Sequence, residues 1–144
     1  MKAPVMLAAL LLARAALAQS LPVIELNAGI HRIEAEVAAS PAARIRGLMQ
    51  RTTLPPARGM LFVFDQEARH CMWMKNTYLP LSVAFLDATG RIINIEEMQP
   101  QTLDNHCAAR PARYALEMNA GWFAQRGIRA GDAISGIGQV PPAH

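Results

Sequence analysis

The chain has 144 residues, a length that suits one domain with a buried core. Its 14 basic and 11 acidic residues give a formal net charge of +3, but Lys2 and Arg14 belong to an N-terminal segment that we expect to be removed. The remaining excess of one positive charge is too small to predict a nucleic-acid partner or an acidic membrane surface, because both favour a clustered basic patch.

The first 18 residues have the pattern of a cleaved export signal. Met1-Lys2 gives a positive start, residues 3–13 are almost wholly apolar, and Ala16-Leu17-Ala18 is the small-x-small pattern that signal peptidase recognises. The apolar run of about 11 residues is well short of the roughly 20 that span a bilayer. The residue directly after the cleavage site is Gln19 and not a cysteine, so we expect no lipid anchor at the new terminus. We therefore predict a soluble, periplasmic or secreted protein without a membrane anchor.

Two strands and a helix are predicted next. Residues 22–26 and 30–37 form strands joined by a turn, and the second alternates apolar and charged residues as a half-buried strand does. Ser40 is predicted to cap a helix that begins at Pro41 and runs to about Gln50. The residues expected on its inner side are Ile45, Leu48 and Met49.

Four strands are predicted in the middle of the chain, at residues 60–64, 70–76, 81–86 and 91–98. The first is a continuous apolar run, which is typical of a buried strand. The isoleucines of residues 91–98 favour a strand there. Residues 87–90 read Asp-Ala-Thr-Gly and predict the turn of a hairpin between the last two strands.

A long polar connection, residues 99–111, and three short elements complete the chain. Residues 113–118 and 133–137 are predicted strands on either side of a short helix. Asn119 is expected to cap this helix and Gly127 to end it. The tail from residue 140 is predicted to be frayed.

Taken together, these elements predict a mainly β fold. Seven or eight short strands with closely spaced turns are typical of an antiparallel β-sandwich or barrel, here jelly-roll-like with two short helices. Neither an internal repeat nor a linker divides the sequence, so we expect a single domain over residues 19–144.

Cys71 and Cys107 are the two cysteines of the chain. An even number of cysteines in an exported protein favours a disulfide bond. The bond would close a loop of about 36 residues and stabilise the fold by roughly 3–4 kcal/mol in the chain-entropy description.

The segment from Trp73 to Thr77 offers the side chains of a small-ligand site. Lys75 is the one lysine outside the signal, and its compact ammonium could act as a point charge. Asn76 and the Trp73 indole would add a donor and an apolar wall, with Arg46 and Glu117 completing the site. The alternative is that Lys75 is solvent-exposed, Asn76 forms a turn and Glu117 pairs with an arginine.

A soft-metal site is a second hypothesis for the same segment. On a strand, His70, Met72 and Met74 would share one face and present an imidazole and two thioethers, a ligand set suited to Cu(I). The simpler interpretation is that the methionines fill the core. A zinc site made from the two His-Cys pairs is disfavoured, because adjacent strand residues point to opposite faces. We predict no metal and no cofactor.

Signatures of hydrolases and nucleotide-binding enzymes are absent from the sequence. It contains no Gly-x-Ser-x-Gly, no His-Glu-x-x-His, no Cys-x-x-Cys and no glycine-rich phosphate loop. Paired cysteines would leave no thiol nucleophile. We predict no catalytic residues, although an enzyme acting on a small or carbohydrate-like substrate stays an alternative.

Several motifs occur in an order that resembles the prokaryotic family called domain of unknown function 192. They are Arg46-Gly47-Leu48-Met49, Arg51, Leu54, Gly59-Met60-Leu61-Phe62, Trp73-Met74-Lys75-Asn76-Thr77, Pro80-Leu81, Phe85, Leu116-Glu117, Gly121 and Gly131-Asp132. The resemblance covers roughly residues 25 to 137 and implies a compact, mainly β fold with no assigned reaction.

Two positions depart from the family pattern. The family often has Asp after its Pro-Leu, where this chain has Ser82, and an aromatic residue before its Trp, where this chain has Met72. If that Asp acted as an acid, a base or a metal ligand in relatives, the role would be vacant here. We therefore expect a domain that binds a small molecule or a partner protein, with periplasmic copper handling or enzymatic activity as alternatives.

Overall fold

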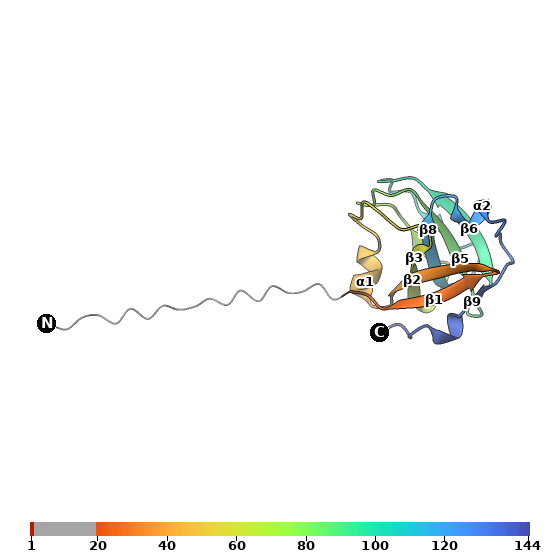
Figure 1. Ribbon diagram of the computed structural model, residues 1–144, viewed down its shortest axis with the longest axis horizontal. Coiled ribbons are helices and arrows are strands. Elements are labelled where there is room, and N and C mark those ends of the chain that lie inside the picture. Colours follow the sequence, from red (N-terminus) through yellow and green to blue (C-terminus); the bar gives the residue numbers. More distant parts are fainter. Residues whose placement is uncertain (2–19) are drawn as a thin grey trace.

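The computed structural model describes residue 1 and residues 20–144 (Figure 1). The predicted export signal lies outside the described residues. Among the residues that are described, no helix is long and apolar enough to cross a membrane.

A curled seven-stranded sheet makes up most of the fold, with the strand order β6-β5-β8-β3-β2-β1-β9. Its neighbouring strands pair antiparallel, except that β2 and β3 are parallel. A second, two-stranded sheet joins β4 to β7. The strands are β1 (Val23–Ala28), β2 (His31–Ala38), β3 (Arg58–Ala68), β4 (Cys71–Met72), β5 (Leu81–Leu86), β6 (Ile92–Met98), β7 (His106–Cys107), β8 (Ala112–Asn119) and β9 (Ile134–Ser135).

The two edges of the large sheet meet at one end. Arg91, just before β6, forms a bridge with Ala133, just before β9. The Ile92 N–H donates to the Asp132 carbonyl at 2.8 Å, and the Ile134 N–H donates to the Gly90 carbonyl at 2.8 Å. The sheet therefore curls toward a barrel, which confirms the predicted mainly β, barrel-like class with two short helices.

Both faces of the central strands are buried. On β3, Leu61 and Val63 point into the curled sheet and join one apolar cluster. Met60 and Phe62 point outward and join a second cluster, which the connecting segments cover. The same alternation places Leu116 inside and Ala115 outside on β8. Burial on two faces explains why residues 60–64 are continuously apolar.

Helix α1 (Pro41–Arg46) lies on the left flank of the curled sheet in Figure 1. As predicted, Ser40 caps it, since the Ser40 Oγ accepts from the Ala43 N–H at 3.2 Å. The helix ends before Gln50 because Gly47 adopts a φ of +47°, a conformation that favours glycine. This early end leaves Leu48 buried, but Ile45, expected inside, is 73% exposed.

The second helix also begins later than predicted. Helix α2 (Trp122–Gln125) is preceded by Gly121 in the left-handed conformation, and Asn119 does not cap it. Asn119 is instead the last residue of β8, and its Nδ2 donates to the Leu54 carbonyl at 2.9 Å. Trp122 and Phe123 are buried in the inner cluster, where α2 covers one end of the curled sheet.

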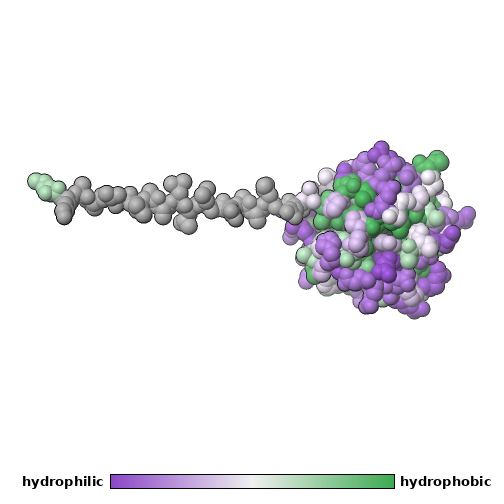
Figure 2. Space-filling view, turned by 90° about the horizontal axis from the view of Figure 1, so that it is seen from below, coloured by the Kyte–Doolittle hydropathy of each residue, from purple (hydrophilic) through white to green (hydrophobic). Residues whose placement is uncertain are grey.

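The C-terminal tail packs against the sheet, so the predicted fraying is wrong. It follows the short 3-10 helix η1 (Ile137–Gln139), and Val140 and Ala143 pack against the inner cluster. The His144 N–H donates to the Ala39 carbonyl at 3.0 Å. The C-terminus lies at the bottom of Figure 1, and the face seen from below carries apolar patches interrupted by polar residues (Figure 2).

Gly59, the one glycine of the paired strands β3 and β8, should not tolerate a larger side chain. A Cβ at Gly59 would lie 2.5 Å from the Glu117 carbonyl oxygen and would also collide with the Met118 sulfur. We expect Gly59→Ala to lower the free energy of unfolding by about 3 kcal/mol, as overpacking does. Gly138→Ala is the control, since nothing lies within 4 Å of its Cβ position. Urea denaturation measures both, and equal losses would contradict the prediction.

Candidate functional site

The segment between β4 and β5, residues 73–80, is mostly irregular and contains one turn at Lys75 and Asn76. The strand expected over residues 70–76 is limited to β4, because the chain bends back after Met72. The Thr77 N–H donates to the Met74 carbonyl at 3.1 Å, and Asn76 has a left-handed φ of +53°. Asparagine tolerates this conformation better than most residues, so the backbone itself accounts for Asn76.

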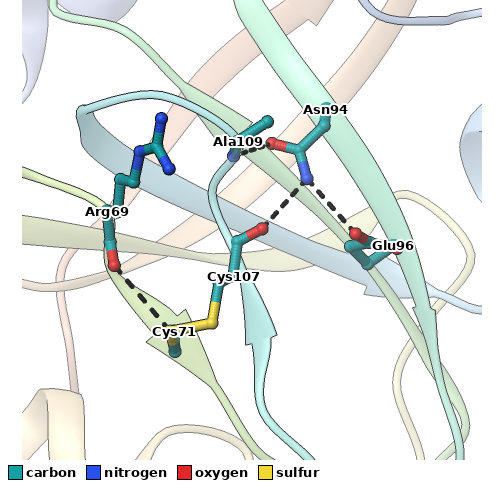
Figure 3. The surroundings of a disulfide bond; sticks show 6 residues. All are labelled: Arg69, Cys71, Asn94, Glu96, Cys107 and Ala109. Carbon is teal, nitrogen blue, oxygen red and sulfur yellow. Dashed lines mark hydrogen bonds between the residues drawn. A yellow bond between two sulfur atoms is a disulfide. The ribbon is translucent and has the colours of Figure 1, made fainter.

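The disulfide bond fixes this segment to the long polar connection (Figure 3). Cys71 is bonded to Cys107, as predicted. The Asn94 side chain holds the other side of the connection, since it donates to the Cys107 carbonyl at 3.1 Å and accepts from the Ala109 N–H at 2.9 Å. The Met74 N–H adds a bond to the Thr102 carbonyl at 3.1 Å. The turn that carries Trp73 is therefore held covalently and by backbone hydrogen bonds.

Glu117 is a buried carboxyl group beneath this cover. It lies on the outer face of β8, directly opposite Met60 of β3 and Val83 of β5. Its residue is only 4% exposed, and no group in the described part of the chain donates a hydrogen bond to its carboxyl. Burial raises the pKa of Glu117 from 4.5 to about 8. Near neutral pH the group is therefore largely protonated and can itself donate a hydrogen bond.

The Glu117 side chain lines a small cavity of about 30 Å³. Room of this size holds one or two water-sized groups. The other lining residues come from α1 and the turn after it, from β3, and from the segment around Trp73. They are Arg44, Ile45, Arg46, Gly47, Leu48, Met49, Phe62, Met72, Trp73 and Thr77.

An apolar groove of about 330 Å³ adjoins this cavity. Trp73, Ile45 and Phe62 line both spaces, so they connect the groove to Glu117. Trp73 is 47% exposed, which leaves part of its indole free to contact a bound molecule. The complete groove lining is Pro41, Arg44, Ile45, Phe62, Phe64, Cys71, Met72 and Trp73.

The two arginines of α1 differ in how their charges are satisfied. Arg44 Nη1 donates to the Ala39 carbonyl at 2.7 Å and to the Val63 carbonyl at 3.0 Å, and its Nη2 lies 3.4 Å from Asp65. Arg46 is exposed, and within residues 20–144 no ion pair is recorded for it. Arg46, which also lines the cavity, therefore carries a charge that no carboxylate of residues 20–144 pairs with.

Three of the five predicted ligand-binding residues lie around one cavity, namely Arg46, Trp73 and Glu117. The other two, Lys75 and Asn76, are not among its lining residues. Lys75 is exposed, and its Nζ lies 5.3 Å from the centroid of the Trp73 ring. This cation–π contact lets Lys75 act on the site through the position of Trp73.

Family membership can be stated from the sequence match. The model of the domain of unknown function 192 family (DUF192), described as an uncharacterised ACR, matches residues 23–136. The chain belongs to this family. The match confirms the resemblance drawn from the ordered motifs, and the comparison with curated proteins gives no match.

Two solved structures are similar to this DUF192 chain. A candidate transcription regulator from Sinorhizobium meliloti 1021 is 36% identical, and the match covers 83% of this chain and 98% of that one with a TM-score of 0.79. A protein of unknown function from Novosphingobium aromaticivorans DSM 12444 is 32% identical, and the match covers 80% of this chain and 86% of that one with a TM-score of 0.76.

The residues of the soft-metal hypothesis do not converge on one point of this DUF192 fold. Met74 is fully buried in the outer cluster, whereas Met72 lies at the groove. The His70 ring stacks on Phe64 with the centroids 3.8 Å apart. A metal bound by all three side chains would require Met74 to leave the core.

Ser82, where the family often has Asp, joins three elements of the fold. Its Oγ donates to Glu97 Oε2 of β6 at 2.6 Å and accepts from the Gly121 N–H, just before α2, at 2.8 Å. The side chain is fully buried. These contacts give Ser82 a structural role that needs no ligand.

Sequence reasoning missed the groove walls contributed by Ile45 and Phe62. Phe62 looked like ordinary core, but the continuous apolar run around it carried a signal, since burial on both faces requires a second layer over the sheet. Ile45 is predicted on the inner side of the helix with Leu48 and Met49, but the structure exposes it at the groove. Thr77 was named with its segment, but its burial at the cavity gave no sequence signal.

The stability of the protein should depend on pH through Glu117. The folded state keeps this proton up to about pH 8 whereas the unfolded chain loses it near pH 4.5, so stability falls as pH rises between these values. We expect a loss of roughly 1 kcal/mol per pH unit from this group. In urea denaturation from pH 5 to 9, Glu117→Gln should remove this component, and the exposed Glu67→Gln should not. Parallel curves for wild type and Glu117→Gln would contradict the assignment.

Removal of the disulfide should loosen the turn that carries Trp73. β4 and β7 pair through only two residues each, so the covalent bond supplies much of their order. We expect the Cys71→Ser and Cys107→Ser double variant to lose about 3–4 kcal/mol of unfolding free energy. Hydrogen exchange should become faster at the Met74 and Ala108 amides but not at those of β5. Unchanged exchange at both amides would show that the bond does not order this segment.

Proposed function

We propose that this DUF192 protein is an exported binding domain for a small organic ligand. The ligand lies in the groove between α1 and Trp73 and places a polar group against Glu117. The observation that carries this proposal is the buried carboxyl of Glu117, which forms no hydrogen bond with any other group of residues 20–144 and lines a cavity next to an apolar groove.

The energetics of Glu117 support a ligand at this position. The Glu117 carboxyl lines the cavity and forms no hydrogen bond with another side chain or backbone group of residues 20–144, so a group placed in the cavity can reach it. A ligand atom there would supply a hydrogen-bond partner, and such a bond contributes about 0.5–1.5 kcal/mol. The hydrogen bond to Glu117 would also orient the ligand in the site.

The groove supplies the apolar half of such a site. Small-molecule sites combine mostly apolar and aromatic walls with a few well-placed polar groups. Here Trp73, Phe62 and Ile45 are the walls, while Glu117 and Arg46 are the polar groups. The groove volume suits a single ring or a short aliphatic chain.

Export to the periplasm or the medium is supported by two features. The first is the signal-like pattern of the N-terminal residues. The second is the disulfide between Cys71 and Cys107, since such bonds persist mainly in oxidising compartments.

The description of one structural neighbour as a transcription regulator is not carried over to this chain. Arg32, Arg44, Arg51 and Arg58 pair with carboxylates of the same chain instead of forming a basic strip. Arg51, for example, makes a two-pronged contact with Glu36 at 2.8 and 2.9 Å. Such pairing weakens the attraction for phosphate groups on which nucleic-acid binding depends.

Binding can be tested with the two tryptophans as internal probes. In ¹H–¹⁵N spectra recorded with a library of small aromatic and aliphatic compounds, binders should move the indole signal of Trp73 and leave that of the buried Trp122 in place. Trp73→Ala, with binding followed at the Ile45 backbone amide of the groove, should weaken binding at least tenfold. Tyr78→Ala is the matched control, because Tyr78 is a similarly exposed aromatic residue that does not line the groove.

Two results would contradict a small-ligand site here. One is a library in which no compound moves the Trp73 signal. The other is a set of binders whose affinities are the same for Trp73→Ala and wild type, which would place them elsewhere on the protein.

A further inference from the structure

The charged side chains that line the cavity are Arg44, Arg46 and Glu117. Both arginines come from α1. Because Glu117 is held protonated near neutral pH, the lining presents positive charge and a hydrogen-bond donor instead of a negative charge. The polar end of the site is therefore electrostatically suited to an anion.

We propose that the ligand is an apolar monocarboxylate, that is, a small aromatic or aliphatic carboxylic acid in its ionised form. This inference rests on the proposed function. The ligand carboxylate accepts a hydrogen bond from the Glu117 carboxyl and pairs with Arg46, while its ring or chain lies in the groove between Trp73 and Ile45.

The size of the cavity favours a carboxylate over a larger anion. Its volume of about 30 Å³ suits one or two water-sized atoms, and a carboxylate has two oxygens on one carbon. A phosphate or sulfonate carries at least three oxygens in a tetrahedral group. The groove of about 330 Å³ then takes the apolar part.

The neighbours of Glu117 disfavour a cationic ligand. An ammonium group in the cavity would share its lining with Arg44 and Arg46, two residues of like charge. Arg44 is already bonded to two backbone carbonyls and to Asp65, so Arg46 is the arginine that a ligand can use. A guanidinium and a carboxylate form a strong charge-assisted pair.

Affinity for a carboxylate should depend on the protonation of Glu117. The other ionisable residues that line the cavity are Arg44 and Arg46, both from α1. The facing residues of β3 and β5, Met60 and Val83, do not titrate. Once Glu117 ionises, two carboxylates face each other and affinity falls by up to tenfold per pH unit.

A charge series of similar compounds tests the proposal on the full chain. Phenylacetate, phenylacetamide and phenethylamine share a ring and differ in the polar end. At pH 7, titrations followed at the Trp73 indole signal should show phenylacetate binding at least tenfold tighter than the other two. Between pH 7 and 9.5, phenylacetate affinity should fall at least tenfold.

Three variants separate the contributions of individual groups. Arg46→Gln should lower the affinity for phenylacetate at least tenfold. Arg110 is an exposed arginine outside the cavity lining, so Arg110→Gln should leave this affinity unchanged. Glu117→Gln keeps a hydrogen-bond donor at the same place, so this variant should still bind phenylacetate near pH 7. Its affinity for phenylacetate should then not change between pH 7 and 9.5.

The outcomes distinguish this inference from the proposed function. Equal or tighter binding of the amide or the amine at Trp73 would overturn the carboxylate assignment and leave a small-ligand site intact. Absence of a Trp73 response to all three compounds, together with the negative library result described above, would overturn both. A pH dependence that persists in Glu117→Gln would remove Glu117 from the recognition.

Discussion

The need to cover the outer face of β3, β5 and β8 governs the rest of this structure. These strands are apolar on both faces, and the curling of the sheet buries only the inner one. The outer face is covered mainly by connecting segments and the short helix α1, which Arg44, the Cys71–Cys107 bond and Asn94 hold in place. Glu117 lies beneath this irregular cover, where the segments leave a small cavity.

Much of the fold could be predicted because local sequence and tertiary environment agree. Residues 81–86 are apolar except for Ser82 and form β5 within the predicted bounds. Disagreements arise where backbone geometry or distant contacts prevail, as at Gly47, whose positive φ ends α1 early, and at Asn76, whose left-handed φ turns a predicted strand. The packing of the tail on Ala39 depends on a contact between residues far apart in sequence, which no local pattern reports.

The candidate site was predicted in part, since Arg46, Trp73 and Glu117 line one cavity. The burial of Glu117 could not be predicted, because an acidic residue in an alternating strand is equally compatible with an exposed position. The absence of Lys75 and Asn76 from the cavity lining could not be predicted either. It follows from a turn that is positioned by backbone hydrogen bonds to residues 101–102 and to Gln50. The make-up of the candidate site thus depends on which loops cover the sheet, and the whole chain determines that cover.

The parallel pairing of β2 with β3 has a consequence for how tightly a ligand can be held. Parallel neighbours cannot be joined by a hairpin, so residues 39–57 must cross from one end of the sheet to the other, and α1 is part of that crossing. One wall of the groove is thus required by the topology and the other is fixed by a covalent bond. A site whose walls are ordered before binding loses little conformational entropy when it is occupied, so even a few contacts can translate into useful affinity.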